Sequence, residues 1–218
     1  MKTYLVMGAS RGLGASVTEY LHANGNHVFA LSRSPAVAGD WVEADVSTDE
    51  GIDKVVEAIG GRTLDGLLYM GGTWEKGAFT DEYEFLKSPR AETRNVIEVN
   101  LVAPILLVQA LAANLRRAEN PRVLLMGSMS GLPNTATMFG LQGVAEAINL
   151  ALRGSGIGVS VIKPDNMATP EVERDIEQGL VDEQTPVALS ELSRTVDYLL
   201  NAGATALPTV VNLTQLKK

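Results

Sequence analysis

The chain has no cysteine and only two histidines among its 218 residues, which excludes several kinds of chemistry. Without cysteine there can be no disulfide bond, no thiolate nucleophile and no cysteine-based metal site. Lysine and arginine number 18 against 26 for aspartate and glutamate, so the formal net charge is −8. A nucleic acid or an anionic membrane is an unfavourable partner for such a chain. We therefore expect no metal, no nucleic acid and no membrane partner.

Long apolar runs are also missing. The first apolar run of the chain is too short for a signal peptide. The longest one, Leu101–Leu115, is interrupted by Pro104, Gln109 and Asn114 and is not expected to span a bilayer. We therefore expect a cytoplasmic protein. The apolar fraction of 45% and the even spread of charged residues predict one folded domain over residues 1–218.

Short apolar runs rich in β-branched residues alternate with helical patterns. The expected strands are Tyr4–Met7, His27–Ser32, Trp41–Glu43, Leu67–Met70, Val123–Met126, Val159–Ile162 and Thr209–Asn212. The expected helices are Gly14–Ala23, Ile52–Ile59, Glu92–Arg117, Gln142–Arg153 and Ser190–Asn201. Alternation at this spacing predicts right-handed βαβ units. The expected fold is therefore α/β, with a Rossmann-like, doubly wound, mostly parallel sheet flanked by helices on both faces.

Two segments follow strands of the expected sheet: Thr73–Ala91, the least regular part of the chain, and the polar Met167–Leu189. Ligands of an open parallel sheet bind outside the carboxyl ends of its strands, where both segments emerge. Each segment is expected to be either a lid over a ligand or a plain surface connection.

A glycine-rich loop follows the first expected strand and opens the first expected helix. Its glycines allow a tight turn, so that N–H groups at the helix N-terminus can face a pyrophosphate. The loop predicts a dinucleotide site, whereas plain turn glycines would have the same spacing. Its candidate cofactor-binding residues are Gly8, Ser10, Arg11, Gly12, Leu13 and Gly14.

The end of the second expected strand indicates which dinucleotide binds. An NAD-selective site has a carboxylate there to hold the ribose 2′-hydroxyl. This strand ends in Ser32 and Arg33 with no acid, and Arg33 can pair bidentately with a 2′-phosphate that Arg11 also approaches. We therefore expect NADP(H) in preference to NAD(H). Asp45 and Val46, after the third strand, suit the adenine edge, unless Asp45 simply caps the next helix.

These elements resemble, in order and spacing, the short-chain dehydrogenase/reductase family over essentially the whole chain. Tyr69-Met70-Gly71-Gly72 is similar to the family's Asn-Asn-Ala-Gly strand end, with both asparagines replaced. Asn100 is similar to the asparagine of its central helix, and Ser128 to its catalytic serine. Val161–Thr169 resembles the family's Pro-Gly…Thr loop, with Asp165 in place of the glycine. The resemblance implies that Ser128 bonds the substrate oxygen. It also implies a cofactor-binding role for Met70, Gly71, Gly72, Pro164 and Thr169.

Pro104 stands four residues after Asn100. In an α-helix the N–H of residue 104 would donate to the carbonyl of residue 100. Proline has no N–H, so the Asn100 carbonyl should be free and the helix should kink. The resemblance implies that this carbonyl holds a water in a proton relay to a catalytic lysine. The alternative is a kink that serves packing only.

The resemblance also implies a tyrosine that donates a proton and, four residues later, a lysine that lowers its pKa. Gly143–Ile148 fits the helix after the lysine, which puts Met138 at the tyrosine position and Gln142 at the lysine position. A shift by one residue puts Phe139 and Gly143 there instead. Neither alignment supplies a phenol or an ammonium, although such proton transfer contributes about 10²–10⁴-fold.

Other side chains are candidates for the missing proton donor. Tyr69 stands at the carboxyl end of a strand, and Tyr83 belongs to a Tyr-x-x-x-Lys sequence that comes too early in the chain. Glu75 and Asp165 are acids on expected loops. Packing or surface roles are the alternative for all four.

The sequence thus predicts an NADP(H)-binding oxidoreductase that acts on a small molecule, with Ser128 retained and the proton relay replaced. Two alternatives stay open: a non-redox enzyme such as an isomerase, cyclase or dehydratase, and an inactive module that senses NADP(H) or binds a partner. The resemblance also implies a homodimer or homotetramer paired through Glu92–Arg117 and Gln142–Arg153. The second of these helices carries more apolar residues than one sheet-facing stripe needs.

Overall fold

The computed structural model describes residues 1–78, 80, 83–129, 136–181, 184–203 and 205–216. Within these residues, seven parallel strands form one sheet in the order β3-β2-β1-β4-β5-β6-β7. The strands are β1 (Thr3–Met7), β2 (His27–Ser32), β3 (Asp40–Glu43), β4 (Gly66–Tyr69), β5 (Arg122–Met126), β6 (Gly158–Pro164) and β7 (Val210–Leu213). The predicted Rossmann-like, doubly wound sheet is confirmed.

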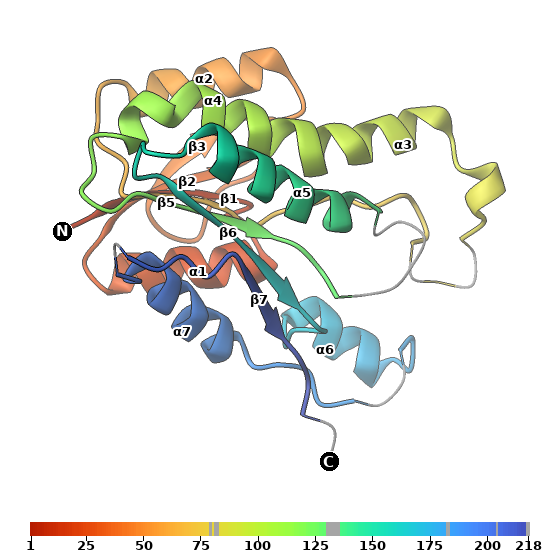
Figure 1. The fold of residues 1–218 in the computed structure, drawn as a ribbon. Helices are drawn as coiled ribbons and strands as arrows, with labels where there is room; N and C mark the ends of the chain where they lie inside the picture. Colours follow the sequence, from red (N-terminus) through yellow and green to blue (C-terminus); the bar gives the residue numbers. More distant parts are fainter. Residues whose placement is uncertain (79, 81–82, 130–135, 182–183, 204, 217–218) are drawn as a thin grey trace.

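Helices cover both faces of the sheet. They are α1 (Gly12–Ala23), α2 (Asp49–Ile59), α3 (Arg90–Ile97), α4 (Ala103–Leu115), α5 (Ala136–Ala151), α6 (Pro170–Glu177) and α7 (Leu189–Leu200). A short 3₁₀ helix, η1 (Phe85–Lys87), precedes α3, and a π-helical turn, η2 (Glu98–Val102), joins α3 to α4. Figure 1 shows α2, α4 and α5 on one face of the sheet and α1 and α7 on the other.

The central strands are buried on both faces, which explains their continuous apolar sequences. Successive side chains of a strand point to opposite faces. Leu67 of β4 therefore packs in the cluster that contains Leu107 of α4, while Leu68 packs in the cluster with Val17 of α1 and Val196 of α7. The two clusters hold the helical layers against the sheet.

The segment from residue 167 to residue 189 is more regular than predicted, because it contains α6. The Thr169 hydroxyl caps this helix by accepting a hydrogen bond from the Val172 N–H at 3.3 Å. Pro170 follows the cap, and Glu171 lies in the first turn. A hydroxyl cap, a proline and an early acid are together typical of a helix start. No helix was predicted over residues 170–177, so α6 is an addition to the expected elements.

The long helix predicted over Glu92–Arg117 is a run from Arg90 to Leu115 that contains the π turn. The Ala103 N–H donates to the Glu98 carbonyl, five residues back. The predicted distortion before Pro104 is thus present, as a π turn. Its extra residue changes which carbonyl the proline leaves free, since at this spacing Pro104 stands opposite Val99 instead of Asn100.

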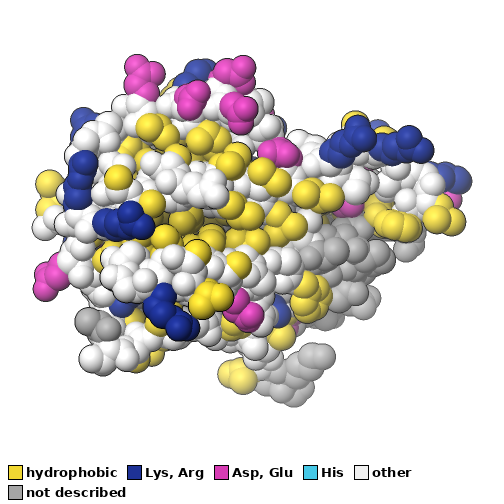
Figure 2. Space-filling view, turned by 45° about the horizontal axis from the view of Figure 1, so that its top comes forward, with side chains coloured by type: hydrophobic (Ala, Val, Ile, Leu, Met, Phe, Trp, Pro, Cys, Tyr) yellow, Lys and Arg dark blue, Asp and Glu magenta, His cyan; other side chains and the backbone are white. Residues whose placement is uncertain are grey.

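By length and apolar composition alone, the run Arg90–Leu115 would suffice to cross a membrane. Its side chains Leu107, Leu111 and Leu115, however, are fully buried in the core. Other apolar side chains of this run lie on the outer face of the molecule beside those of α5 (Figure 2). Much of its apolar character is therefore that of a core helix.

Candidate active site

The glycine-rich loop joins β1 to α1 and packs against the end of β4. Gly8 has a φ of 87°, and a Cβ on it would lie 2.8 Å from the Gly71 Cα. A Cβ on Gly14 would lie 2.1 Å from the Gly8 carbonyl oxygen. Both distances are far shorter than any van der Waals contact, so glycine is required at both positions for the loop to close.

The first turn of α1 presents its N–H groups to open space. Within the described part of the chain, the Arg11 side chain at the N-cap position makes no capping hydrogen bond. A Cβ on Gly12, whose φ is 55°, would meet nothing within 4 Å. Ser10 is half-buried and Arg11 exposed. Because the first four N–H groups of a helix have no partner inside it and carry its positive dipole end, this turn fits a pyrophosphate.

Arg33 and Asp45 lie together beyond the ends of β2 and β3. The Arg33 side chain is 78% exposed, and its Nη1 lies 3.9 Å from Asp45 Oδ2. The Asp45 carboxylate accepts hydrogen bonds from the Ser47 hydroxyl at 2.7 Å and the Ser47 N–H at 3.0 Å. The two hydrogen bonds from Ser47, and to a smaller extent the positive charge of Arg33, hold the pKa of Asp45 below its ordinary value. Asp45 does not cap α2, because Thr48 does so by accepting from the Gly51 N–H.

Several other candidate residues at this end have structural contacts. The Ser32 hydroxyl donates to the Ser34 carbonyl at 2.7 Å. Val46 and Met70 are buried, and Leu13 packs against the core beneath α1. Val46 packs in the cluster on the α2 and α4 side of the sheet, and Met70 and Leu13 pack in the cluster on the α1 and α7 side, so their observed roles are in packing.

Asn100 joins three segments that are far apart in the sequence. Its side-chain oxygen accepts from the Thr73 N–H at 2.9 Å, and its amide donates to the Thr73 carbonyl at 2.9 Å and to the Thr137 hydroxyl at 3.1 Å. The residue is only 1% exposed. Asn100 therefore ties the segment after β4 and the first turn of α5 to the π turn. The predicted water relay concerns its backbone carbonyl and stays a prediction.

Met138 and Gln142 lie on α5 in different surroundings. Met138 is 3% exposed, and a Cβ on Gly72 would lie 3.5 Å from its Cε and 3.3 Å from Asn100 Oδ1. The Gln142 amide donates to Glu146 on the same helix at 3.2 Å. Of the two residues, Met138 is the one that lies beside Asn100 and the end of β4.

Ser128 follows β5 and runs beside the end of β6. The next N–H, that of Met129, donates to the Pro164 carbonyl at 3.1 Å. The segment after β5 that contains Ser128 therefore lies beside the end of β6. Thr169 is buried, and its hydroxyl accepts from the Val172 N–H at the start of α6, so its observed role is structural.

The other candidate donors divide into two groups. The Tyr69 hydroxyl donates to the Val99 carbonyl at 2.5 Å, and burial raises the pKa of Tyr69 well above its ordinary value. Tyr69 therefore donates to the carbonyl that Pro104 leaves free, which is a structural role. Within the described residues, the Tyr83 hydroxyl and one carboxylate oxygen of Glu75 are buried without a hydrogen-bond partner. Asp165 accepts from the backbone of Gln215.

Comparison with known proteins relates the chain to one family. The family model for short chain dehydrogenase matches residues 2–179. The mitochondrial D-beta-hydroxybutyrate dehydrogenase of Mus musculus is 25% identical over 246 residues, which cover 97% of this chain and 71% of the relative. ElxO, solved with NADP bound, superposes with a TM-score of 0.81 at 16% identity and covers 98% of this chain and 97% of its own.

A second solved structure is that of the 3-ketoacyl-(acyl-carrier-protein) reductase from Brucella melitensis, complexed with NADH. Its TM-score is 0.79 at 20% identity, with 98% of this chain and 96% of the reductase covered. Both solved structures have the fold described above.

Proposed function

Because the chain belongs to the short-chain dehydrogenase family, we propose that it is an oxidoreductase that binds NADP(H) and acts on a small molecule. The observation that carries this proposal is the loop from Gly8 to Gly14, which closes against Gly71 and leaves the first turn of α1 uncapped. The NADP of ElxO and the NADH of the Brucella reductase support a nicotinamide cofactor. When bound, NADPH supplies a hydride, and the chain has to bind and orient the acceptor and admit a proton.

Two arginines support NADP(H) over NAD(H). Arg33 and Arg11 are both exposed at the carboxyl end of the sheet. The 3.9 Å pairing of Arg33 with Asp45 joins two exposed groups and is weak, so Arg33 is available to a 2′-phosphate. Ser32 occupies the strand end where an NAD-selective site has an acid.

Calorimetric titration with NADPH and NADH tests the cofactor preference. We expect NADPH to bind more tightly, and Arg33→Ala to weaken it by about 1–3 kcal/mol, the scale of one or two charge-assisted bonds. The affinity for NADH should hardly change. Arg90→Ala, at an exposed arginine that begins α3, is the charge-matched control. Equal affinities for the two cofactors would contradict the preference.

The expected alignment puts Met138 at the tyrosine position and Gln142 at the lysine position. Met138 is buried near Gly72, and the Gln142 amide donates to Glu146 on its own helix. Neither this alignment nor the one shifted by one residue has a phenol or an ammonium. We therefore propose that Ser128 holds the substrate oxygen while water or the substrate itself supplies the proton.

An NADPH-oxidation assay over a panel of aldehydes and ketones tests this mechanism. We expect slow reduction by the wild type, and loss of that activity in Ser128→Ala with the affinity for NADPH unchanged. Ser190→Ala, at an exposed serine of α7, is the control. Activity that survives Ser128→Ala would remove the serine from the mechanism. If no carbonyl is reduced, the alternatives are a non-redox enzyme or a module that senses NADP(H), both consistent with the missing tyrosine and lysine.

We also propose a homodimer or homotetramer that pairs through α4 and α5. Figure 2 shows apolar side chains gathered across the face over these helices. They include the partly buried Leu101, Leu106, Val144 and Ile148 and the 64% exposed Leu150. A contiguous apolar face of this kind typically marks a protein–protein interface. Light scattering should give a dimer or tetramer mass at micromolar concentration, and Leu150→Glu should lower it. A monomeric wild type would contradict the proposal.

A further inference from the structure

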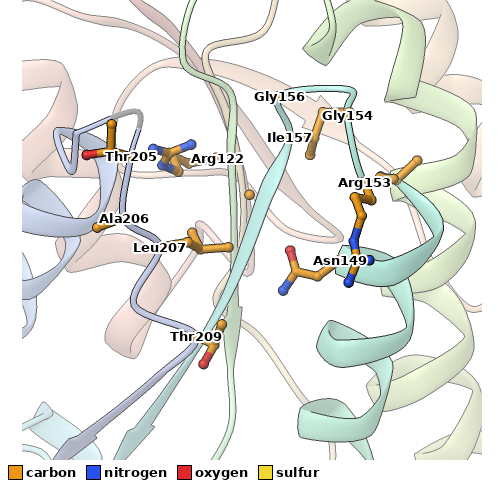
Figure 3. Close-up of a pocket in the computed structure, with 12 residues that line it drawn as sticks. Arg122, Asn149, Arg153, Gly154, Gly156, Ile157, Thr205, Ala206, Leu207 and Thr209 are labelled. Atoms are coloured by element: carbon orange, nitrogen blue, oxygen red, sulfur yellow. The ribbon is translucent and has the colours of Figure 1, made fainter.

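A cavity of about 320 Å³ lies at the opposite end of the sheet from the glycine-rich loop (Figure 3). Arg122 and Gly158, which line it, are the first residues of β5 and β6, whereas the glycine-rich loop follows the last residue of β1. All strands are parallel, so these are opposite edges. The turn between α5 and β6 and the segment before β7 complete the lining. The cavity is therefore separate from the proposed cofactor site.

The charge around this cavity differs from that of the chain as a whole. Its lining contains two arginines, Arg122 and Arg153, and no carboxylate among the described residues. The whole chain has a formal net charge of −8. A local excess of two positive charges in such a chain favours an anionic ligand.

Arg122 is 4% exposed and only partly satisfied. Its guanidinium donates to the carbonyls of Pro121 at 3.3 Å, Ala202 at 3.0 Å and Gly203 at 3.4 Å. The last two carbonyls follow α7 and lie at its negative dipole end, which offsets part of the charge. The Arg122 Nε is buried without a hydrogen-bond partner in the described structure. Burial also lowers the pKa of Arg122. A buried cation with unmet donors is stabilised by an anion.

The turn between α5 and β6 adds backbone donors. Gly154 and Gly156 have φ values of 84° and 81°, and open space surrounds the Cβ position of each. The N–H groups of Ser155 and Ile157 are bonded within the turn, whereas those of the two glycines have no partner in the described chain. Left-handed residues in a turn direct N–H groups into a concave anion site.

We propose that this cavity binds a phosphoryl group, as inorganic phosphate or a phosphate monoester, between Arg122, Arg153 and the N–H groups of Gly154 and Gly156. Guanidinium groups pair bidentately with phosphate, and the N–H groups orient it. Figure 3 shows Arg122 toward the segment before β7 and Arg153 on the α5 side. The ligand therefore connects these two parts. A Cβ on Gly158 would lie 3.1 Å from Arg122 Nη1, so glycine there admits the guanidinium.

Calorimetric titration with inorganic phosphate, at constant ionic strength in chloride, tests the site. We expect saturable binding of one phosphate, weakened about tenfold or more by Arg153→Ala. Arg153 is exposed, so this variant keeps the fold. Arg116→Ala, an exposed arginine just after α4, has the same change in net charge and should bind phosphate as the wild type does. Gly156→Ala should also weaken binding, because alanine rarely adopts that φ.

A second titration separates this site from the cofactor site. In protein saturated with NADPH, phosphate should still bind with the same affinity. If NADPH does not bind, Arg33→Ala replaces saturation, so a failed cofactor proposal leaves this test intact. Absence of saturable binding, equal effects of Arg153→Ala and Arg116→Ala, or loss of phosphate binding with NADPH or Arg33→Ala would each overturn the proposal.

Discussion

The loop between β1 and α1 and the first turn of α5 meet at the same edge of the sheet, but their sequences are constrained by different contacts. In the loop, Gly14 faces the Gly8 carbonyl at a distance that no side chain fits. In α5, Met138 occupies an apolar position beside Gly72 and Asn100 that several side chains could fill. Backbone contact forbids change in the first region, whereas the second requires only volume and low polarity.

Under the proposed function, this difference lets the fold stay intact while the proton relay of the family is replaced. Asn100 holds Thr73 and Thr137 through its side chain, whatever residue stands at position 138. The architecture around the relay thus does not depend on the relay itself.

The largest effect should come from restoring the relay. Met138→Tyr with Gln142→Lys should raise NADPH-dependent carbonyl reduction by about 10²–10⁴-fold, the usual contribution of general acid catalysis. Each single change should do little, since a tyrosine without its lysine keeps a pKa of about 10. The measurement is the initial rate of NADPH oxidation over the carbonyl panel.

The double variant Phe139→Tyr with Gly143→Lys follows the alignment shifted by one residue and is the matched comparison. Phe139 is exposed, so a tyrosine there should face solvent. We expect this pair to leave the rate unchanged. A larger gain from it than from the Met138 and Gln142 pair would favour the shifted alignment.

The second prediction concerns the glycine-rich loop between β1 and α1. Gly14→Ala should destabilise the fold by about 3 kcal/mol or more, because the new Cβ overlaps the Gly8 carbonyl. It should also abolish NADPH binding. Gly12→Ala meets open space and has only the left-handed backbone to oppose it, at about 1–2 kcal/mol. Urea unfolding measures the loss of stability in both variants. Equal losses would mean that backbone conformation, and not atomic overlap, requires glycine at these positions.

Both the strands and the glycine loop could be predicted from local sequence, because burial on both faces and strand–loop–helix order leave clear patterns. α6 was missed although Thr169 and Pro170 mark its start. The early start of α5 was missed too: Met138 and Leu141 are buried apolar residues there, but Thr137 and Gly140 are poor helix formers. The Asn100 network was out of reach for another reason. It depends on three segments that meet only in space. The cavity at Arg122 likewise combines four segments that are far apart in the sequence.

The third prediction tests whether Tyr69 belongs to the chemistry or to the fold. Tyr69→Phe should destabilise the protein by about 1–3 kcal/mol, because the Val99 carbonyl loses its donor while Pro104 cannot replace it. The rate of carbonyl reduction per folded molecule should not change. Tyr4→Phe is the control: Tyr4 is also buried in a strand, and its hydroxyl has no hydrogen bond within the described residues. A rate that falls by orders of magnitude would make Tyr69 a proton donor.

The smallest effect should be a pH-dependent one at the dinucleotide end. The Ser47 hydroxyl is the largest cause of the lowered pKa of Asp45, so the folded state favours the ionised carboxylate. A lowered folded pKa contributes stability above the ordinary value of 3.8, and this stability is lost as the pH falls below it. Ser47→Ala should therefore destabilise the protein at pH 7 by less than about 1 kcal/mol, since the carboxylate is 44% exposed. The difference from wild type should be the same at pH 5 and shrink toward pH 3. Urea unfolding of both proteins across this range, with the exposed Ser34→Ala as control, measures it. A difference that grows in acid would show that Ser47 does not lower the pKa of Asp45 in the folded state.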